Sequence, residues 1–504
     1  MKMTREQKYR LLDEVEQQEI EQLLQKIQAS PWRQQYHIQP TMGLLNDPNG
    51  FAYYDGYYHL FYQWFPLGTD HGMKYWYHLK STDLVNWIDC GIGVKPGDWF
   101  DSHGAYSGSG IEYEGKLYLM YTGNTRNTEW QRHSYQCVAM MDQNGHICKL
   151  EQPVIAAVPA GYTEHFRDPK VWRDGDSFYC VIGAQRSNLS GAIVMYRSPN
   201  MVDWELLGEL ETALPQFGYM WECPDYWEMN GQAVLLFCPQ GLAAEGEQYR
   251  NIYQSGYVSG KPLALPELKL EHGSFRELDY GFDFYAPQTT TRPDGRRILV
   301  GWMGLPDTHY PTDGHGWAHC LTLPRELELR ADGVLLQKPV PELALQRGKK
   351  VEWAGLLPEG RSQYDGLSGI TYELDCRLQW DANDRYAGDA GALTFGLELR
   401  TGECERTVLR YEAGSRRLTL DRSLSGQPFA EAYGTTRTIL LERELERLHL
   451  FVDVSSVEIF VNDGEAVLTS RIFPQHSSQG IVFVAEAGQV KLHAEKWEYP
   501  SKQM

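Results

Sequence analysis

Five short runs of apolar and aromatic residues recur at nearly constant spacing through the N-terminal three fifths of the chain. A glycine precedes each run by two or three residues, at Gly56, Gly115, Gly175, Gly231 and Gly295. The runs start at residues 58, 117, 178, 234 and 298, so the starts are 59, 61, 56 and 64 residues apart. A period of this size filled with short strands is typical of a β-propeller, in which each repeat is one blade. Five repeats predict five blades.

A second similarity supports the same period. Residues 81–87 (Ser-Thr-Asp-Leu-Val-Asn-Trp) resemble residues 198–204 (Ser-Pro-Asn-Met-Val-Asp-Trp), which begin 117 positions later. That separation is about two repeats. The alternative is chance similarity among β-rich segments, which five matches at near-constant spacing disfavour.

A polar cluster lies eleven to thirteen residues before each run. The clusters occupy residues 46–50 (Asn-Asp-Pro-Asn-Gly), 106–110 (Tyr-Ser-Gly-Ser-Gly), 167–169 (Arg-Asp-Pro), 222–225 (Glu-Cys-Pro-Asp) and 285–288 (Tyr-Ala-Pro-Gln). In a propeller the first strand of each blade lines the central channel. Because the clusters hold equivalent places in the repeat, we expect them to converge at one mouth of that channel and form one polar site.

Beyond about residue 350 the repeat gives way to alternation of polar and apolar residues. Residues 371–378 and 448–454 show this period of two, and Asn462-Asp463-Gly464 is a hairpin turn signal. The predicted fold class is therefore all-β: a five-bladed β-propeller followed by a C-terminal β-sandwich, with a short N-terminal helix. The predicted boundaries are 1–30 for an amphipathic helical segment, 31–336 for the propeller, 337–350 for a linker and 351–504 for the sandwich.

Composition and charge narrow the classes of function. The chain has 67 acidic and 47 basic residues, a formal charge of −20, which argues against a nucleic-acid or anionic-membrane partner. Its nine cysteines are scattered without a CxxC pair, which predicts reduced thiols and neither a disulfide framework nor a zinc site. The first thirty residues hold no apolar run typical of a signal peptide, and no stretch approaches the roughly 20 apolar residues of a membrane span. We therefore expect a cytoplasmic protein, either a monomer or a homodimer.

Three carboxylates of the converging clusters are the candidates for the proposed site, those of Asp47, Asp168 and Glu222. Glycoside hydrolysis requires paired carboxylates: an ionised one attacks the anomeric carbon, and a protonated one assists the leaving oxygen and later activates water. Taken singly, Asp47 fits a turn residue, Asp168 fits half of a structural pair with Arg167, and Glu222 fits a rim charge. Their joint placement in three repeats favours catalysis, with Asp168 binding sugar hydroxyls.

These residues match a known family, because the chain resembles glycoside hydrolase family 32, the invertases and fructosidases. Residues 283–288 and Gly301-Trp302 match in addition to the clusters, so the resemblance covers almost the whole first 330 residues. It implies a propeller followed by a sandwich, a retaining mechanism, a sugar substrate and neither a metal nor a cofactor. It also implies Asp47 as nucleophile, Asp168 as transition-state stabiliser and Glu222 as acid/base.

The resemblance implies a set of contacts to the sugar as well. These substrate-binding candidates are Asn46, Gln63, Trp76, Tyr106, Ser107, Arg167, Tyr285 and Trp302. Cys223, which follows Glu222, is either a residue that tunes the acid/base or a small buried filler.

One segment departs from the pattern of many family members. Where they carry Trp-Gly and then Trp-Gly-His, this chain has residues 71–78, His-Gly-Met-Lys-Tyr-Trp-Tyr-His. This version, with residues 61–64 and 314–317, resembles the bacterial members that act on sucrose 6-phosphate. A lysine in this loop can hold a phosphate as a point charge. Lys74, His71 and His315 are therefore the phosphate-binding candidates, in falling order, and the alternative for Lys74 is a solvated surface lysine.

Several functions remain open at this point. Cleavage of the β-fructofuranosyl bond of sucrose 6-phosphate, and of sucrose, is the first expectation, and a sucrose-specific invertase or another β-fructosidase is the alternative. A non-catalytic sugar-binding propeller predicts the loss of one carboxylate, and all three are present. Fructosyl transfer starts from the same fructosyl-enzyme, so a minor transferase activity stays possible. An extracellular levan or inulin hydrolase would carry an export signal.

Overall fold

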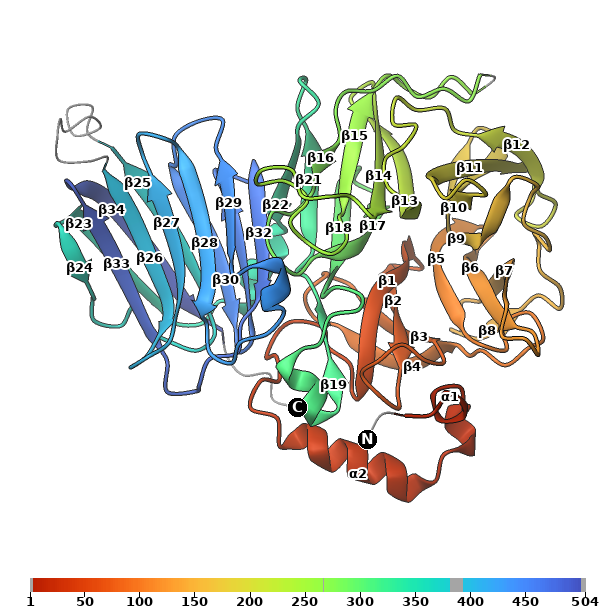
Figure 1. Cartoon of the computed structure of the whole chain (residues 1–504), viewed down its shortest axis with the longest axis horizontal. Helices are drawn as coiled ribbons and strands as arrows, with labels where there is room; N and C mark the ends of the chain where they lie inside the picture. The colour runs from red at the N-terminus through yellow and green to blue at the C-terminus, as the bar shows by residue number, and fades with distance from the viewer. Residues whose placement is uncertain (1–2, 266, 381–392, 500–504) are drawn as a thin grey trace.

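The computed structural model describes residues 3–265, 267–380 and 393–499, and Figure 1 shows two β-rich bodies side by side. The ends of the predicted N-terminal segment and of the predicted sandwich, residues 1–2 and 500–504, lie outside the described residues. Among the described residues, no helix combines the length and the apolar character needed to cross a membrane.

Within the described residues, the first body consists of five sheets that follow one another along the chain, and they are antiparallel except for one short strand added to the first. The first holds β1 (Gly43–Tyr54), β2 (Tyr57–Phe65), β3 (Tyr75–Ser81) and β4 (Ile88–Val94). The second holds β5 (Ala105–Tyr113), β6 (Lys116–Arg126), β7 (Arg132–Met141) and β8 (Ile147–Lys149). The third holds β9 (Tyr162–Asp174), β10 (Ser177–Arg186), β11 (Gly191–Ser198) and β12 (Glu205–Glu209).

The fourth sheet holds β13 (Met220–Met229), β14 (Gln232–Gln240), β15 (Gly256–Gly260) and β16 (Arg276–Glu277). The fifth holds β17 (Tyr285–Thr291), β18 (Arg297–Met303), β21 (Arg325–Leu329) and β22 (Leu335–Pro339), with β20 (Cys320–Leu321) beside β18. Because β22 belongs to this sheet, the last strand of the first body extends past residue 336.

The first strands of the five sheets face a common axis, so the first body is a β-propeller. Strand β1 lies beside β5, β5 beside β9, β9 beside β13, β13 beside β17, and β17 beside β1. A further strand, β19 (Trp317–Ala318), follows the short helix η2 (Pro311–His315) and pairs in parallel with β1. This pairing joins the end of the propeller to its start, which protects an otherwise open sheet edge.

The two similar seven-residue segments form the same turn after the third strand of the first and third sheets. Leu84 and Met201 both adopt a left-handed backbone, with φ of 65° and 69°. The indole nitrogens of Trp87 and Trp204 donate to the carbonyl oxygens of these residues, each at 3.0 Å. The sequence similarity therefore reflects a repeated structure.

In the part of the chain that the structure describes, the second body is a β-sandwich of two six-stranded sheets, drawn from teal to blue in Figure 1. One sheet holds β23 (Lys350–Leu357), β34 (Val490–Glu498), β25 (Tyr372–Gln379), β30 (Arg447–Asp453), β31 (Ser456–Val461) and β32 (Ala466–Arg471). The other holds β24 (Gly360–Ser362), β33 (Gly480–Glu486), β26 (Thr394–Thr401), β27 (Arg406–Glu412), β28 (Arg417–Leu424) and β29 (Thr436–Leu440). The short helices η3 (Pro341–Gln346) and η5 (Glu431–Tyr433) lie before and within the sandwich.

Alternation along the sandwich strands builds its core, as the sequence predicted. Leu374, Cys376 and Leu378 of β25 are buried in one cluster with Leu448 and Leu450 of β30. The predicted hairpin turn is confirmed, since Asn462 and Asp463 link β31 to β32 with φ of 48° and 62°. Val461 pairs with Ala466, so the loop has four residues, and Asn462, Asp463 and Gly464 all take left-handed φ values, which these residue types adopt readily.

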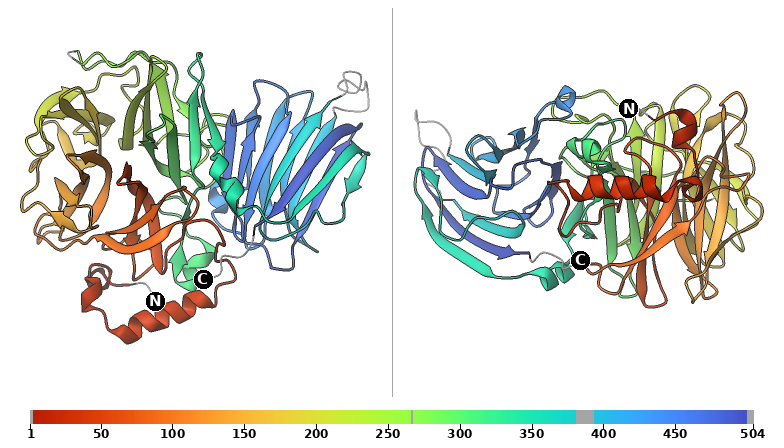
Figure 2. Two further views of the ribbon diagram at one scale, coloured as in Figure 1. Left: turned by 180° about the vertical axis from the view of Figure 1, so that it is seen from behind. Right: turned by 90° about the horizontal axis from the view of Figure 1, so that it is seen from below.

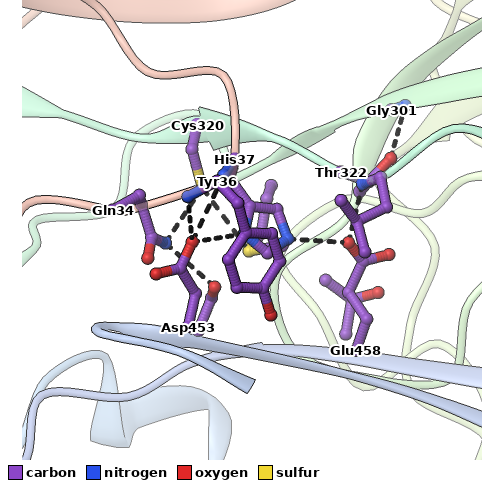
Figure 3. A network of polar contacts seen from close by, with 12 residues as sticks. Gln34, Tyr36, His37, Gly301, Cys320, Thr322, Asp453 and Glu458 are labelled. Carbon is purple, nitrogen blue, oxygen red and sulfur yellow. Dashed lines mark hydrogen bonds and ion pairs between the residues drawn. The ribbon is translucent and has the colours of Figure 1, made fainter. Parts of the chain in front are cut away.

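A buried polar network joins the sandwich to the propeller (Figure 3). His37 places Nδ1 2.8 Å from Asp453 Oδ2 and Nε2 3.0 Å from Glu458 Oε1. Burial lowers the pKa of His37, but hydrogen bonds to the two carboxylates outweigh burial and raise it. Arg325 of the propeller pairs with Glu458 at 2.7 Å. A buried charge without its partners is costly, so these contacts fix the orientation of the two bodies.

The N-terminal segment folds as α1 (Arg5–Lys8), η1 (Leu12–Glu14) and α2 (Gln17–Gln28), and α2 crosses the edge of the propeller in Figure 2. Lys8 forms an ion pair with Asp70 at 3.1 Å, and its carbonyl oxygen accepts from the Met73 N–H at 2.8 Å. These contacts hold α1 against the loop between β2 and β3. The segment therefore reaches the same mouth of the channel as the polar clusters.

Candidate active site

A cavity of about 320 Å³ opens at the ends of the first propeller strands. Eleven predicted site residues line it: Asn46, Asp47, Gln63, His71, Lys74, Tyr106, Arg167, Asp168, Glu222, Tyr285 and Trp302. They come from all five sheets and from the loop between β2 and β3. Residues separated by up to 256 positions, from Asn46 to Trp302, thus meet at one place.

A β-bulge interrupts the first strand of every sheet at its polar cluster. The register shifts between Leu45 and Pro48 in β1, between Ala105 and Gly108 in β5, between Glu222 and Asp225 in β13, and between Tyr285 and Gln288 in β17. In β9 the register shifts between Arg167, which pairs with Gly183, and Lys170, which pairs with Val181. A bulge adds a residue and re-aims side chains, so these shifts point the clusters into the cavity.

Three of the bulges contain a strained backbone. Asp168, Cys223 and Ala286 have φ of 67°, 48° and 46°, and each precedes a proline. A left-handed non-glycine residue before proline is unfavourable, and such strain is concentrated at functional sites. The rest of the sheet holds these residues in place, because the residues that flank each bulge pair with the second strand. The flanking residues are Arg167 and Lys170, Glu222 and Asp225, and Tyr285 and Gln288.

Asp47 is held by neutral donors and faces another carboxylate. Its Oδ1 accepts from Asn46 Nδ2 at 3.1 Å, and its Oδ2 accepts a short hydrogen bond from Ser107 Oγ. Burial raises the pKa of Asp47, the Ser107 hydrogen bond opposes the rise, and the charge of Glu222 adds to it. Two donors that favour the anion orient the Asp47 carboxylate toward the cavity.

Asp168 shares its surroundings with Asp47 through Cys223. The backbone N–H of Cys223 donates to Asp168 Oδ2 at 3.0 Å, and the Cys223 sulfur lies 3.6 Å from Asp168 Oδ2 and 3.8 Å from Asp47 Oδ2. Burial raises the pKa of Asp168 to about 7, although the Arg167 guanidinium lowers it in part. The position of Cys223 is thus compatible with both interpretations from the sequence, a residue that tunes the acid/base and a small buried filler.

Glu222 accepts hydrogen bonds on both oxygens. Arg167 donates to Oε1 from Nε at 2.9 Å and from Nη2 at 2.6 Å. Gln240 Nε2 and Tyr285 Oη donate to Oε2 at 2.7 and 2.6 Å. The Tyr285 hydroxyl can also accept, so this shell can accommodate Glu222 with or without its proton.

Lys74 lies deep in the cavity beside the Asp47 end. It is 2 % exposed, and its ammonium donates a short hydrogen bond to Asn46 Oδ1. Burial lowers the pKa of Lys74 to about 7, and the charge of Asp47 offsets part of that effect. Lys74 is therefore a buried partner of Asn46 and not the solvated surface lysine that was its alternative.

Three predicted residues lie outside the lining of this cavity. Ser107 is buried and bonded to Asp47, so it supports the site from behind. Trp76 is fully buried, and its indole N–H donates to the backbone oxygen of Tyr106 at 3.0 Å. His315, in η2, stacks edge-on against Trp32 of the N-terminal region.

Several lining residues were missed from the sequence: Tyr9, Arg126, Arg132, Gln240, Tyr253, Pro306 and Asp307. Most follow the second strand of a sheet or lie in long loops, where no repeat signal marks them. The two arginines flank the five-residue turn between β6 and β7, a strand pair of which only the first strand was predicted. His319 was missed as well, although it accepts the Trp302 indole hydrogen bond at 2.7 Å.

We expect Asp168→Asn to stabilise the protein more at pH 8 than at pH 5. The pKa of Asp168 is about 7 in the folded protein against 3.8 for a free aspartate. Between about pH 4 and about pH 7 the folded protein keeps a proton on Asp168 that the unfolded chain has already released. The free energy of unfolding therefore falls as pH rises from about 4 to about 7. Asparagine removes this loss and keeps an acceptor for the Cys223 N–H.

Thermal unfolding at a series of pH values checks this expectation. The difference in Tm between Asp168→Asn and the unmodified protein should grow by several degrees from pH 5 to pH 8. Asp176→Asn, in the exposed turn between β9 and β10, controls for the loss of one negative charge. A Tm difference that is constant or shrinks with pH contradicts the raised pKa.

Buried and partly buried carboxylates that converge in a sugar-sized cavity define a class of protein, the glycosidases. The profile of the glycosyl hydrolases family 32 N-terminal domain matches residues 37–339, and that of the family 32 C-terminal domain matches residues 342–498. The chain belongs to glycosyl hydrolase family 32.

Individual relatives are similar to this chain over nearly its whole length. The sucrose-6-phosphate hydrolase of Staphylococcus xylosus is 47% identical over 496 residues, which cover 98% of each chain. The solved structure of sucrose-6-phosphate hydrolase from Lactobacillus gasseri has a TM-score of 0.90 at 39% identity and covers 99% of this chain and 100% of its own. A β-fructofuranosidase structure from Bombyx mori has a TM-score of 0.81 at 30% identity, covering 96% and 97%.

Proposed function

We propose that this protein is a retaining β-fructofuranosidase that hydrolyses sucrose 6-phosphate, and also sucrose, through a covalent fructosyl-enzyme. The observation that carries this proposal is the meeting of Asp47, Asp168 and Glu222 in one cavity. The 47% identity to a sucrose-6-phosphate hydrolase over 98% of both chains supports the substrate. A phosphorylated sugar does not cross membranes freely, so this substrate also supports the cytoplasmic location.

In the first step the Asp47 carboxylate attacks C2 of the fructosyl unit. The C2–O bond to the glucosyl unit breaks, and Glu222 gives its proton to the departing oxygen. Arg167 and Gln240 keep the Glu222 carboxyl oriented, and the Tyr285 hydroxyl turns to accept while Glu222 is protonated. The products of this step are the free glucosyl sugar and a fructosyl ester of Asp47.

In the second step Glu222, now ionised, takes a proton from water, and the water oxygen attacks C2 of the ester. The Asp47 carboxylate leaves, and fructose is released with its original anomeric configuration. We assign Asp168 to the fructosyl hydroxyls, whose hydrogen bonds strengthen as positive charge develops at C2. Asn46, Gln63, Tyr106, Arg167, Tyr285 and Trp302 complete the sugar site, with Ser107 and Trp76 behind them.

We infer that the five sheets are the five blades of the propeller, and that the boundary to the sandwich lies between Pro339 and Pro341. The ring of contacts from β1 to β17 and back to β1 supports the number of blades. The pairing of β22 through Pro339, followed by η3 from Pro341, supports the boundary.

Comparison of two substrates tests the proposed substrate. We expect kcat/KM for sucrose 6-phosphate to exceed that for sucrose by at least about tenfold, the ratio that one charge-assisted contact supplies. Release of glucose 6-phosphate and of glucose is measured with separate coupled assays. Equal or higher efficiency on sucrose would favour the invertase alternative.

A further inference from the structure

Two arginines face each other across the β6–β7 hairpin at the rim of the cavity. Arg126 ends β6, Arg132 begins β7, and the two are direct register partners. Both line the cavity. Like charges directly opposite each other on neighbouring strands destabilise a sheet. A hairpin that keeps such a pair needs an explanation.

Neither arginine is neutralised by the protein. Within the part of the chain that the structure describes, no carboxylate pairs with either guanidinium, and the Nε of each is buried without a hydrogen-bond partner. Arg132 Nη1 meets only the ring nitrogen of His165, at 3.2 Å. The guanidinium carbons lie 5.8 Å from the rings of Trp130 and Tyr106. In a chain with a net charge of −20, two unpaired arginines at one cavity are a site for an anion.

The pair lies on the Glu222 side of the cavity. His165 Nδ1 accepts from Arg132 and also from Arg167 Nη1 at 3.0 Å, and Arg167 binds Glu222. Burial and the two neighbouring arginines lower the pKa of His165 to about 4, so the ring is neutral and does not compete for the anion. Glu222 protonates the oxygen that departs with the glucosyl unit. The arginines therefore face the glucosyl unit.

Lys74 faces the opposite part of the substrate. Its ammonium is bonded to Asn46 and interacts with Asp47, the group that attacks the fructosyl carbon. In sucrose 6-phosphate the phosphate is carried by C6 of the glucosyl unit. A phosphate at that position points away from the Asp47 side of the cavity.

We propose that Arg126 and Arg132 bind the phosphate of the glucosyl unit and set the preference for the phosphorylated substrate. This assignment rests on the proposed function and moves the phosphate site from Lys74, His71 and His315 to the β6–β7 hairpin. The planar guanidinium forks can each donate two hydrogen bonds to phosphate oxygens. Tyr9, from the N-terminal segment, forms the neighbouring wall, with its ring 5.3 Å from that of Trp130.

The test measures kcat/KM on sucrose 6-phosphate and on sucrose for Arg126→Gln, Arg132→Gln and the double variant. Each single change should lower the ratio of the two efficiencies roughly 10- to 100-fold, since each removes charge-assisted hydrogen bonds to phosphate. Arg197→Gln, which removes an exposed and ion-paired arginine of β11, is the matched control and should leave the ratio unchanged. Lys74→Met should lower both efficiencies and leave the ratio unchanged.

Inorganic phosphate supplies a second readout that does not depend on turnover. Phosphate should raise the Tm of the unmodified protein and of Arg197→Gln, and should not raise the Tm of the double variant. Without phosphate, either single variant should melt at or above the unmodified protein, because the facing charges are relieved. These measurements also show that the variants are folded.

The outcomes separate the two proposals. If the unmodified protein does not prefer sucrose 6-phosphate, the proposed substrate fails, and phosphate-dependent melting still tests the arginines as an anion site. If the preference is present and both arginine variants keep it, the arginine assignment is overturned. A ratio that falls in Lys74→Met instead would return the phosphate site to Lys74.

Discussion

Replacing Asp47 with asparagine is expected to lower kcat by roughly 10⁴- to 10⁶-fold, the range for loss of a nucleophile in covalent catalysis. Asparagine has nearly the same shape, and its amide can keep one of the contacts to Asn46 and Ser107. The fold should therefore survive. Asparagine cannot form the fructosyl ester, so only slow direct attack by water remains.

Initial rates on sucrose and sucrose 6-phosphate measure this effect, and the thermal midpoint reports on folding. Because desolvation and the charge of Glu222 raise the pKa of Asp47, the variant should melt at or above the unmodified protein at neutral pH. Asp176→Asn, an exposed substitution of the same kind, should keep its activity. Activity of Asp47→Asn within about tenfold of normal would end the assignment of the nucleophile, because loss of a covalent nucleophile costs far more.

Replacing Glu222 with glutamine is expected to lower kcat on sucrose by roughly 10²- to 10⁴-fold, the usual contribution of general acid–base catalysis. The first step loses the proton for the glucosyl oxygen, and the second loses the base for water. A substrate whose leaving group needs no proton, such as a nitrophenyl fructoside, should still form the fructosyl-enzyme. Azide, which needs no base, should then attack this intermediate.

The signature of acid/base loss is therefore rescue by azide with formation of fructosyl azide. Mass spectrometry identifies the azide product, and stopped-flow release of nitrophenol shows a fast first turnover. Tyr285→Phe removes a partner of Glu222 but keeps the carboxyl, so it should be slower without any rescue. If azide has no effect on Glu222→Gln, Glu222 acts on orientation or binding and not as acid/base.

The propeller and its converging clusters could be predicted because the repeat appears in the sequence as short motifs at nearly constant spacing. A strand that pairs only with its neighbours in one sheet leaves a local pattern, and five such patterns imply an axis. Asp47, Asp168 and Glu222 lie in equivalent positions of the first, third and fourth sheets, and the cavity lining contains all three. The bulges were not predicted, because a register shift depends on the partner strand.

The sequence alone determined the family, the strand repeat and which carboxylates meet, because each depends on short motifs and their spacing. Only the tertiary structure shows where each cation lies relative to Asp47 and Glu222, and our assignment of the two ends of the substrate rests on those positions. Lys74 was predicted to bind the phosphate because its loop departs from the family pattern. The fold places its ammonium against Asn46, beside Asp47, which is why we propose a different phosphate site. The Arg126–Arg132 pair carries no motif, since its meaning lies in strand register and in the absence of a counter-charge within the described residues. Burial and distance between charges, which determine these roles, are properties of the packed chain.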